Sequence, residues 1–570
     1  MSEEFQVSGK NEAAPFTLTL HRGDGMVLVA MNWRHGRPPD DFVGFAIQYR
    51  EPNGDRFFNL NNRLGFPDKN GEVDPTTLST MLSPIQKFRW VHFPRNAELA
   101  GAFLYRVTPV FMNDRNELSY GLAQEAPIEL RRETYPGQLN VCFTRGFVSS
   151  QAFVDRYQSA GDIATLLPAT ADEGLSFRPT HPKTQEALAW MGFEARNAIL
   201  EVLDQAIADH ADVCVIAYDL NQPEVVSRLE RMGNRLRILI DNEGDHGKAG
   251  SAENQAEDRL VASAGRANVR RQHMGQLQHN KLIVADGPTV QRVVCGSTNF
   301  SWRGFFVQAN NAVILQGANT VAPFQAAFDA YWASDKVADF GKTASAKGID
   351  MGLPGIDVRA AFSPHAKSNA LLATIADDIG RGTTSCLFYS LAFLYQTPGP
   401  VLDAIKGVTA RDDLFVYGIS DRRVGGLDLQ KPDGNVAPVS AAALSHNVPP
   451  PFSNEPVGGG GTRMHHKFAV IDFDKPTARV YLGSYNFSST ADLKNGENLL
   501  LIRDRRIATS YVVEALRIFD HYHFRVAQQE AATAQRQLLL KRPPRAAGQA
   551  AWFAEDYKVP RKIRDRELFA

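Results

Sequence analysis

The stretch MHHKFAVIDFDKPTARVYLGSYNFSSTADLKNGE, residues 464–497, holds His465, Lys467 and Asp472 in the order H-x-K-x4-D. An apolar run from residue 468 to residue 471 follows the lysine directly and is typical of a buried strand. The motif therefore stands at one end of a rigid element. A turn of the form G-S-x-N comes next, with its defined positions at Gly483, Ser484 and Asn486.

Both patterns occur together a second time, in the stretch QHNKLIVADGPTVQRVVCGSTNF at residues 278–300. One such motif could arise by chance, but two copies with the same following turn indicate an internal duplication. The repeat of H-x-K-x4-D consists of His279, Lys281 and Asp286, and the repeat of G-S-x-N consists of Gly296, Ser297 and Asn299.

The spacing of histidine and lysine predicts that each pair shares one space. In a strand, residues i and i+2 point to the same face, so the residue between them points away. Each imidazole is then expected to lie beside an ammonium group. The alternative, two satisfied core histidines with neighbouring surface lysines, does not explain why the whole constellation is duplicated.

The region around the motifs alternates strand patterns with helix patterns, and the order in the first half recurs in the second. This predicts an α/β fold with two duplicated lobes, residues 136–350 and 351–530. Strands that alternate with helices predict a largely parallel sheet covered on both faces. The two motif strands can then meet at a pseudo-twofold interface, and ligands commonly bind in clefts of this kind.

The ends of the chain have different patterns. Residues 1–135 contain seven candidate strands separated by turn residues, which predicts an N-terminal β-sandwich of immunoglobulin or fibronectin III type. Residues 531–570 interleave basic residues with Trp552, Phe553 and Tyr557. We expect this C-terminal tail to pack on the body, because its aromatic side chains need burial.

Composition limits the functional classes only loosely. The 570 residues carry 62 Lys and Arg against 63 Asp and Glu, so no global charge attracts nucleic acid or an anionic membrane. We identify no secretory signal and no apolar stretch of about 18 residues, which predicts a cytoplasmic protein without a stable membrane span. The four cysteines lie in apolar or strand-like runs and are expected to be buried, reduced thiols.

The paired motifs and turns resemble the phospholipase D superfamily, the HKD phosphodiesterases, over residues 139 to 528. The second motif is most similar to the bacterial HKD nucleases. The resemblance implies two phospholipase D-like lobes and a metal-independent hydrolase that forms a covalent phosphohistidine. It also implies that Glu497 orients His279 of the opposite lobe. Where the second motif has Asn495-Gly496-Glu497, we align Asn310-Asn311-Ala312 in the first, which leaves His465 without an equivalent carboxylate.

The residue types suit attack on phosphorus. A neutral imidazole is a competent nucleophile, and a second, protonated imidazole can donate to the leaving alkoxide and then take a proton from water. We expect His279 to be the nucleophile and His465 the general acid and base. Asp286 and Asp472 are expected to support loops. Charge on the non-bridging oxygens is expected to be held by Lys281, Lys467, Asn299 and Asn486, with help from Ser297 and Ser484.

Neighbouring loops contain further candidates. Arg266, Arg270, Arg271 and Arg463 are candidate substrate-binding residues, because basic groups beside a phosphodiester site can bind a polyphosphate backbone. A solvated surface is an equally good interpretation of these arginines.

No cofactor or metal is expected. A zinc site at His465 and His466 fails because adjacent strand residues point to opposite faces. Residues 241–245 resemble a calcium loop but lack the acidic twelfth position, where Ala252 stands.

Three functions remain open. The first is a metal-independent nuclease acting on DNA or RNA, which is favoured by the nuclease-like second motif and the local arginines. The second is a phospholipase D that hydrolyses or transphosphatidylates phospholipids, with the β-sandwich as a membrane-docking module. The third is a non-catalytic binding protein on an HKD scaffold, which only Ala312 supports. The sequence does not identify a regulatory protein partner.

Overall fold

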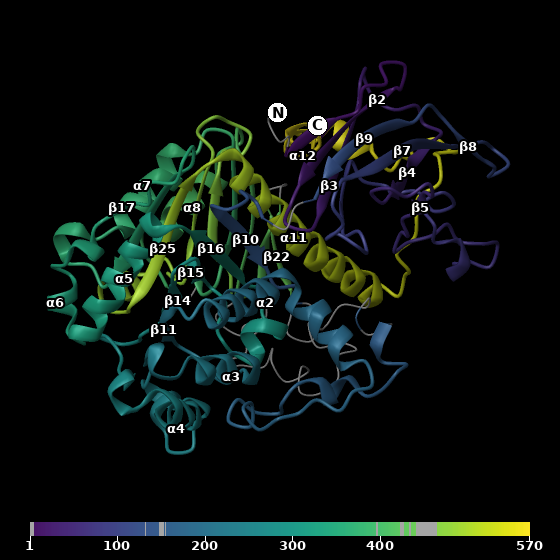
Figure 1. The fold of residues 1–570 in the computed structure, drawn as a ribbon. Helices are drawn as coiled ribbons and strands as arrows, with labels where there is room; N and C mark the ends of the chain where they lie inside the picture. The colour runs from purple at the N-terminus through teal and green to yellow at the C-terminus, as the bar shows by residue number, and fades with distance from the viewer. Residues whose placement is uncertain are drawn as a thin grey trace. The chain divides into compact units, whose positions relative to one another are not determined.

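The computed structural model describes residues 5–130, 133–146, 153, 156–394, 397–421, 427–431, 435–439 and 464–570 (Figure 1). The chain forms two compact units. The first combines the N-terminal and C-terminal parts of the chain as Met1–Arg132, Gln430–Asn435 and Thr509–Ala570. The second contains both motifs and consists of Glu133–Leu429 and Val436–Ala508.

The first unit is rich in antiparallel β-structure, as the sequence predicts for the N-terminal region. The immunoglobulin or fibronectin III type remains a prediction. One sheet has the order β1 (Gln6–Ser8), β2 (Phe16–Arg22), β3 (Val27–Trp33), β6 (Arg89–His92). The other has the order β5 (Phe58–Asn59), β4 (Phe42–Arg50), β7 (Ala102–Met112), β8 (Leu118–Tyr120), and β9 (Gln124–Glu129) also pairs with β7.

The C-terminal segment contributes to the core of this unit. Phe553 is fully buried in a cluster that includes Phe16 of one sheet and Phe45 of the other. The indole nitrogen of Trp552 donates to the carbonyl of Phe42 at 3.1 Å. Helix α12 (Pro560–Leu568) carries Asp565, whose carboxylate pairs with the guanidinium of Arg89 at 2.9 Å.

The second unit contains a seven-stranded and a nine-stranded sheet whose central strands follow the same order. The first sheet runs β10 (Leu139–Phe143), β16 (Asn311–Gln316), β15 (Gln291–Gly296), β14 (Lys281–Asp286), β11 (Asp212–Ala217), β12 (Leu236–Ile240), β13 (Val269–Arg271). The second runs β17 (Ile349–Asp350), β18 (Asp357–Ser363), β25 (Glu497–Arg503), β24 (Arg479–Gly483), β23 (Lys467–Ile471), β19 (Cys386–Leu391), β20 (Phe415–Asp421), β21 (Leu427–Gln430), β22 (Val436–Val439). The α/β duplication expected from the sequence is therefore confirmed.

The prediction of largely parallel sheets is wrong. In the first sheet β11 pairs in parallel with β12, and β12 with β13, but β10, β16, β15, β14 and β11 are joined by antiparallel pairs. The second sheet repeats this arrangement, since β19 is parallel to β20 but antiparallel to β23. The physical reason is loop length. Residues 287–290 are too few for the crossover that a parallel pair of β14 and β15 would need.

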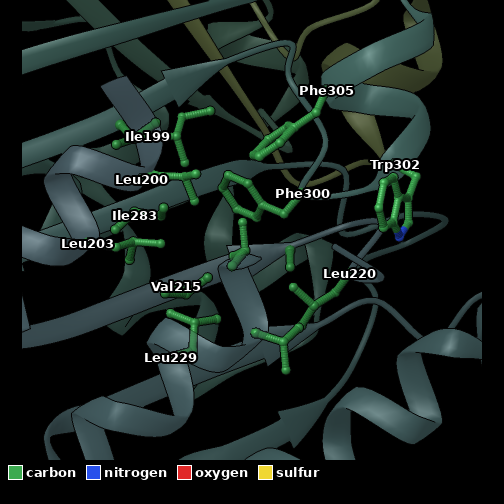
Figure 2. Packing of buried hydrophobic residues seen from close by; sticks show 14 of the residues in the cluster. Ile199, Leu200, Leu203, Val215, Leu220, Leu229, Ile283, Phe300, Trp302 and Phe305 are labelled. Atoms are coloured by element: carbon green, nitrogen blue, oxygen red, sulfur yellow. The ribbon is translucent and has the colours of Figure 1, made fainter. Parts of the chain in front are cut away.

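Helices cover both faces of the first sheet. Side chains of Ile199 and Leu203 pack in one cluster with Val215 and Ile283 (Figure 2). The alternate residues Leu282 and Val284 are buried outside that cluster, on the face that helix α5 covers. The larger helices of this unit are α2 (Thr184–Ala208), α3 (Pro223–Met232), α4 (Ala252–Ala264), α5 (Ala318–Ala333), α7 (Leu372–Gly382) and α8 (Pro400–Thr409).

Two shorter α-helices of this unit are α6 (Val337–Phe340) and α10 (Ser489–Leu493). Helix α11 (Arg505–Thr533) runs from the last residues of the second unit into the first. Across the described ranges, none of the helices combines the length and apolar character that a membrane crossing requires. All four cysteines are buried, as the sequence predicts.

The glycine of each G-S-x-N turn has a steric reason. Gly296 and Gly483 adopt φ values of +124° and +147°, which side chains rarely tolerate. A Cβ added at Gly483 would lie 2.2 Å from the carbonyl oxygen of Asn498, and one at Gly296 would lie 2.7 Å from that of Asn311. These close approaches seat each turn against the first residues of the neighbouring strand.

We therefore expect Gly483→Ala to destabilise the second unit by about 1–3 kcal/mol, because the added methyl group collides with backbone and the φ value is strained. Gly407→Ala is the matched control, since that glycine lies in α8 with no atom near the added Cβ. It should stabilise the protein by up to about 1 kcal/mol. Thermal unfolding of the intact chain tests both, and an unchanged melting temperature for Gly483→Ala would contradict the steric argument.

Candidate active site

The two motif histidines lie together. The ring centroids of His279 and His465 are 6.4 Å apart, and the rings are inclined at 68°. Both residues are buried, with 4% and 5% of their surfaces exposed. The histidines of the two motifs therefore lie side by side within the second unit.

Each histidine is positioned by backbone pairing with the opposite lobe. The amide of His279 donates to the carbonyl of Gly496 at 2.8 Å, and the amide of His465 donates to the carbonyl of Ala309 at 3.2 Å. Isolated parallel bridges, Gln278 with Gly496 and Ala309 with Met464, accompany these bonds. The histidines precede β14 and β23 rather than lying inside them, so the opposite lobe fixes their backbone.

Glu497 contacts His279 directly. Its carboxylate accepts from Nδ1 of His279 at 2.8 Å and from the side-chain amide of Asn495 at 3.1 Å. Because a carboxylate only accepts, Nδ1 carries the proton and Nε2 has the free lone pair in the neutral ring. Burial lowers the pKa of His279, and the negative charge of Glu497 opposes that shift.

His465 has a neutral partner that the sequence alignment missed. Oδ1 of Asn310 accepts from Nδ1 of His465 at 2.8 Å, while the amide nitrogen of Asn310 donates to the carbonyl of Gly304 at 2.9 Å. The carbonyl of Ser297 lies 3.1 Å from the same Nδ1. Burial lowers the pKa of His465 well below its ordinary value, and the charges of Lys467 and Lys281 lower it further.

The expected correspondence of Ala312 with Glu497 is therefore wrong by two residues. The amide of Asn311 donates to the hydroxyl of Ser297 at 3.0 Å, and the amide of Asn498 donates to that of Ser484 at 3.0 Å. These matching bonds align Asn311 with Asn498, and hence Asn310 with Glu497. The sequence signal for this alignment is the asparagine that pairs with each turn serine, Asn311 in the first lobe and Asn498 in the second. Matching these two residues requires the strand register, which the motif spacing does not give.

The two motif lysines are buried beside the histidines. Nζ of Lys467 donates to the carbonyl of His465 at 2.8 Å, and Nζ of Lys281 donates to the carbonyl of His279. Burial lowers the pKa of Lys281 to about 8 and that of Lys467 well below its usual value. Both ammonium charges also lower the pKa of both imidazoles, so the four groups share one electrostatic environment.

The turn residues divide into two groups. Oδ1 of Asn299 and Oδ1 of Asn486 have no hydrogen-bond partner among the residues that the structure describes. The hydroxyl of Ser297 instead donates to Oδ1 of Asn310 at 3.0 Å, and the hydroxyl of Ser484 accepts a backbone amide. Both serines thus have structural contacts, while the amide oxygens of the two asparagines remain available as acceptors.

The motif aspartates lie at the far ends of their strands. Asp472 is fully buried, and its carboxylate accepts from the amides of Thr384, Ser385 and Cys386 at 2.7–3.1 Å. It therefore holds the start of β19. Asp286 is exposed and accepts from the side chain of Gln291 at 3.1 Å.

The candidate substrate-binding arginines are engaged by protein groups. Arg266 pairs with Glu257, Arg270 donates to the carbonyl of Trp332, and Arg271 donates to the carbonyls of Asp241 and His246. Arg463 and the glycines at 458–461 lie outside the described residues. The proposed contacts of these arginines with substrate remain predictions.

Two further groups near the histidines carried no sequence signal. The centroid of the Tyr218 ring lies 4.7 Å from that of His279, and Nζ of Lys281 lies 4.7 Å from the centroid of the Tyr218 ring. Asp421 ends β20 with 5% of its surface exposed, and burial raises its pKa to about 7. Both residues follow buried apolar strands, where periodicity alone does not distinguish functional from structural side chains.

The asymmetry between the histidines can be measured. We expect Glu497→Gln to lower the pKa of His279, because the charge that opposes the burial effect is lost. The pKa of His465 should change little, since its direct partner is the neutral Asn310, and it serves as the internal control. NMR titration of histidine-labelled protein measures both, and an unchanged or raised pKa at His279 would contradict this electrostatic account.

Comparison with known families agrees with this geometry. The family model described as "Cardiolipin synthase, PLD-like domain" matches residues 199–332 and 377–519, which contain both motifs. The chain is 46% identical over 48 residues to a protein named phospholipase D from Rickettsia prowazekii (strain Madrid E) and 44% identical over 48 residues to one from Rickettsia felis. Each alignment covers 8% of this chain, and the chain spans 22% of the length of these curated relatives.

Solved structures with detectable similarity include phosphatidylserine synthase from Haemophilus influenzae Rd KW20, with 13% identity and a TM-score of 0.41 over 60% of this chain and 92% of that one. The phospholipase D family member Nuc from Salmonella typhimurium has 22% identity and a TM-score of 0.20, over 24% of this chain and 87% of that one. The family match and the paired motifs together identify residues 199–332 and 377–519 as a phospholipase D-like domain.

Proposed function

We propose that this protein is a phosphodiesterase that works through a covalent phosphohistidine at His279. The observation that carries the proposal is the placement of two buried imidazoles with ring centroids 6.4 Å apart, each with Nδ1 bonded to the opposite lobe. These two bonds use Nδ1 of each ring and do not involve either Nε2 atom. A single phosphorus atom between them would have one nitrogen for attack and another for proton transfer.

The first step forms a bond from Nε2 of His279 to phosphorus and breaks the bond to the leaving oxygen. The ring becomes a phosphorylated cation, and Glu497 at 2.8 Å stabilises that positive charge. His465, protonated on Nε2 when the anionic diester is bound, gives that proton to the departing alkoxide. The neutral partner Asn310 keeps the imidazolium of His465 acidic, which favours this donation.

The second step returns the enzyme to its starting state. Neutral His465 takes a proton from water, the resulting oxygen attacks phosphorus, and the bond to Nε2 of His279 breaks. If an alcohol replaces the water, the same step transfers the phosphoryl unit instead. Lys281, Lys467, Asn299 and Asn486 are proposed to hold the non-bridging oxygens in both steps. No step in this scheme needs a metal.

For the substrate we rank a phospholipid diester first and nucleic acid second. The description of the matching family model and the printed names of the Rickettsia relatives concern phospholipid enzymes. The support that arginines lent to nucleic acid is weakened, because Arg266, Arg270 and Arg271 bind protein groups. The nuclease-like second motif keeps nucleic acid as the alternative. Two complete His and Lys pairs argue against a non-catalytic scaffold.

Removal of either histidine should abolish turnover. We expect His279→Ala and His465→Ala to reduce phosphodiester cleavage by at least about a thousandfold, within the range for lost nucleophilic and acid–base catalysis. Phosphatidylcholine vesicles, plasmid DNA, single-stranded DNA and RNA are tested in parallel, with and without EDTA. His35→Ala, at an exposed position of the first unit, is the control and should leave the rate unchanged.

Cleavage should survive EDTA, and loss of cleavage on chelation while circular dichroism shows an unchanged fold would contradict the metal-free scheme. Nucleic-acid cleavage without headgroup release would reverse the order of the two substrates. Turnover that persists in both histidine variants would contradict the proposed catalytic role of the histidine pair.

The two roles can be separated with an activated diester, bis(p-nitrophenyl) phosphate, whose leaving group departs without a proton. His465→Ala should then release about one equivalent of p-nitrophenolate in a burst and stall, because the base for the second step is missing. His279→Ala should give no burst. Mass spectrometry should locate the trapped phosphoryl group on His279, and an adduct on His465 would reverse the assignment.

A further inference from the structure

A second cluster of ionisable side chains lies beside the histidine pair. It comprises Asp219, just after β11, His246 in the turn Gly244–Gly247, and Glu253 in the first turn of α4. One potential ligand atom from each lies within 4.8 Å of the other two. The ring of Tyr218 separates the cluster from His279, with centroids 4.5 Å from the ring of His246 and 4.7 Å from that of His279.

We propose that Asp219, His246 and Glu253 bind a divalent transition metal, with Zn²⁺ the best match. One imidazole and two carboxylates are ligands that zinc accepts, and three protein ligands leave a fourth position for water. The cluster takes no part in the histidine chemistry proposed above. The ion would instead stabilise the packing of residues 241–253 against β11 and the first motif.

The orientation of His246 supports this assignment. Its Nδ1 donates to Oδ1 of Asp241 at 2.9 Å, which directs Nε2 toward the cluster. Metal-bound histidines typically have a carboxylate or carbonyl on the other ring nitrogen in this way. Asp241 is fully buried, and it also accepts from the backbone amides of Glu243 at 2.9 Å and Gln278 at 2.6 Å. Its lone pairs are thus already used, so it is assigned to positioning rather than to ligation.

The contact between His246 and Asp219 fits two ligands of one ion. Nε2 lies 3.2 Å from Oδ1 of Asp219, which is longer than the 2.7–2.9 Å or so typical of a charge-assisted bond. Two ligands bound at about 2.0–2.1 Å in tetrahedral geometry are separated by about 3.3 Å. The bond to Asp241 has the ordinary length, so the difference lies on the side that faces the cluster.

Glu253 supplies an independent observation. It is 5% exposed, and one carboxylate oxygen accepts from the amide of Leu220 at 3.1 Å. The charges that act on this carboxylate are those of His246 and Asp219, and no lysine or arginine of the described residues forms an ion pair with it. A buried carboxylate in this state needs a positive partner. A protonated His246 would bond directly to Asp219 and Asp241 but would act on Glu253 only through space.

The local charge is also suitable. Three carboxylates and one imidazole converge here, while Lys281 and Arg303 act on Asp219 through space. A rotation of the Glu253 side chain must close the remaining distance when the ion binds. The proposed site differs from the calcium loop considered for residues 241–245. Of the acidic residues in that stretch only Asp241 takes part, and it orients His246 instead of binding the ion.

The test uses metal-free, full-length protein titrated with ZnCl₂ by calorimetry, with the bound metal counted by elemental analysis. We expect one equivalent of Zn²⁺, a raised melting temperature, and binding at least tenfold weaker in Glu253→Gln and in His246→Gln. Asp258→Asn is the matched control, because that residue is exposed on the same helix. It should bind zinc like the unmodified protein.

His465→Ala separates this site from the catalytic pair and should still bind one equivalent. Circular dichroism of each metal-free variant confirms its fold, and Asp219→Asn replaces any variant that does not fold. Full-strength binding by Glu253→Gln and His246→Gln, or no zinc binding by the unmodified protein, would overturn the proposal. So would binding that His465→Ala abolishes, since the ion would then occupy the catalytic pair. Turnover by the histidine pair is a separate readout, so the two proposals can fail independently.

Discussion

The site depends on a reciprocal exchange of backbone hydrogen bonds between two duplicated lobes. The backbone amide of His279 donates to the carbonyl of Gly496, just before β25. The backbone amide of His465 donates to the carbonyl of Ala309, just before β16. Each lobe thus fixes the histidine of the other. A side chain at residue 496 would displace that of Gln278, whose amide oxygen would lie 2.1 Å from the added Cβ. The backbone bonds and the bridges of Gln278 with Gly496 and of Ala309 with Met464 link the two lobes directly. The geometry of the pair is therefore set by backbone, which moves little.

The duplication is symmetric in topology and asymmetric in charge. Glu497 and Asn310 occupy equivalent positions and contact Nδ1 of their histidines at the same distance of 2.8 Å. Only one of these contacts carries a negative charge. A common fold therefore gives two imidazoles different proton affinities, and acid–base chemistry at a phosphodiester needs such a difference.

Polar groups around the pair extend its organisation beyond the motifs. Asp241 joins the backbone of Gln278 to the turn that carries His246, and Tyr218 lies between that turn and His279. Buried polar networks of this kind rigidify a site when every member has a partner. The proposed ion would give Glu253 a direct positive partner, and the phosphodiesterase chemistry would proceed on a scaffold that the ion stabilises.

The sequence by itself determined the duplicated motif, the buried strand behind each lysine, the α/β character of the lobes and the β-rich N-terminal region. These features follow from local periodicity and from residue identity. Only the tertiary structure decided the antiparallel pairing of β14 with β15, the partner of His465 and the convergence of Asp219, His246 and Glu253. Asn310 lies 155 residues before His465, and its register depends on how β15 and β16 pair. Contacts across such separations arise from strand register and chain crossing, which local patterns do not encode.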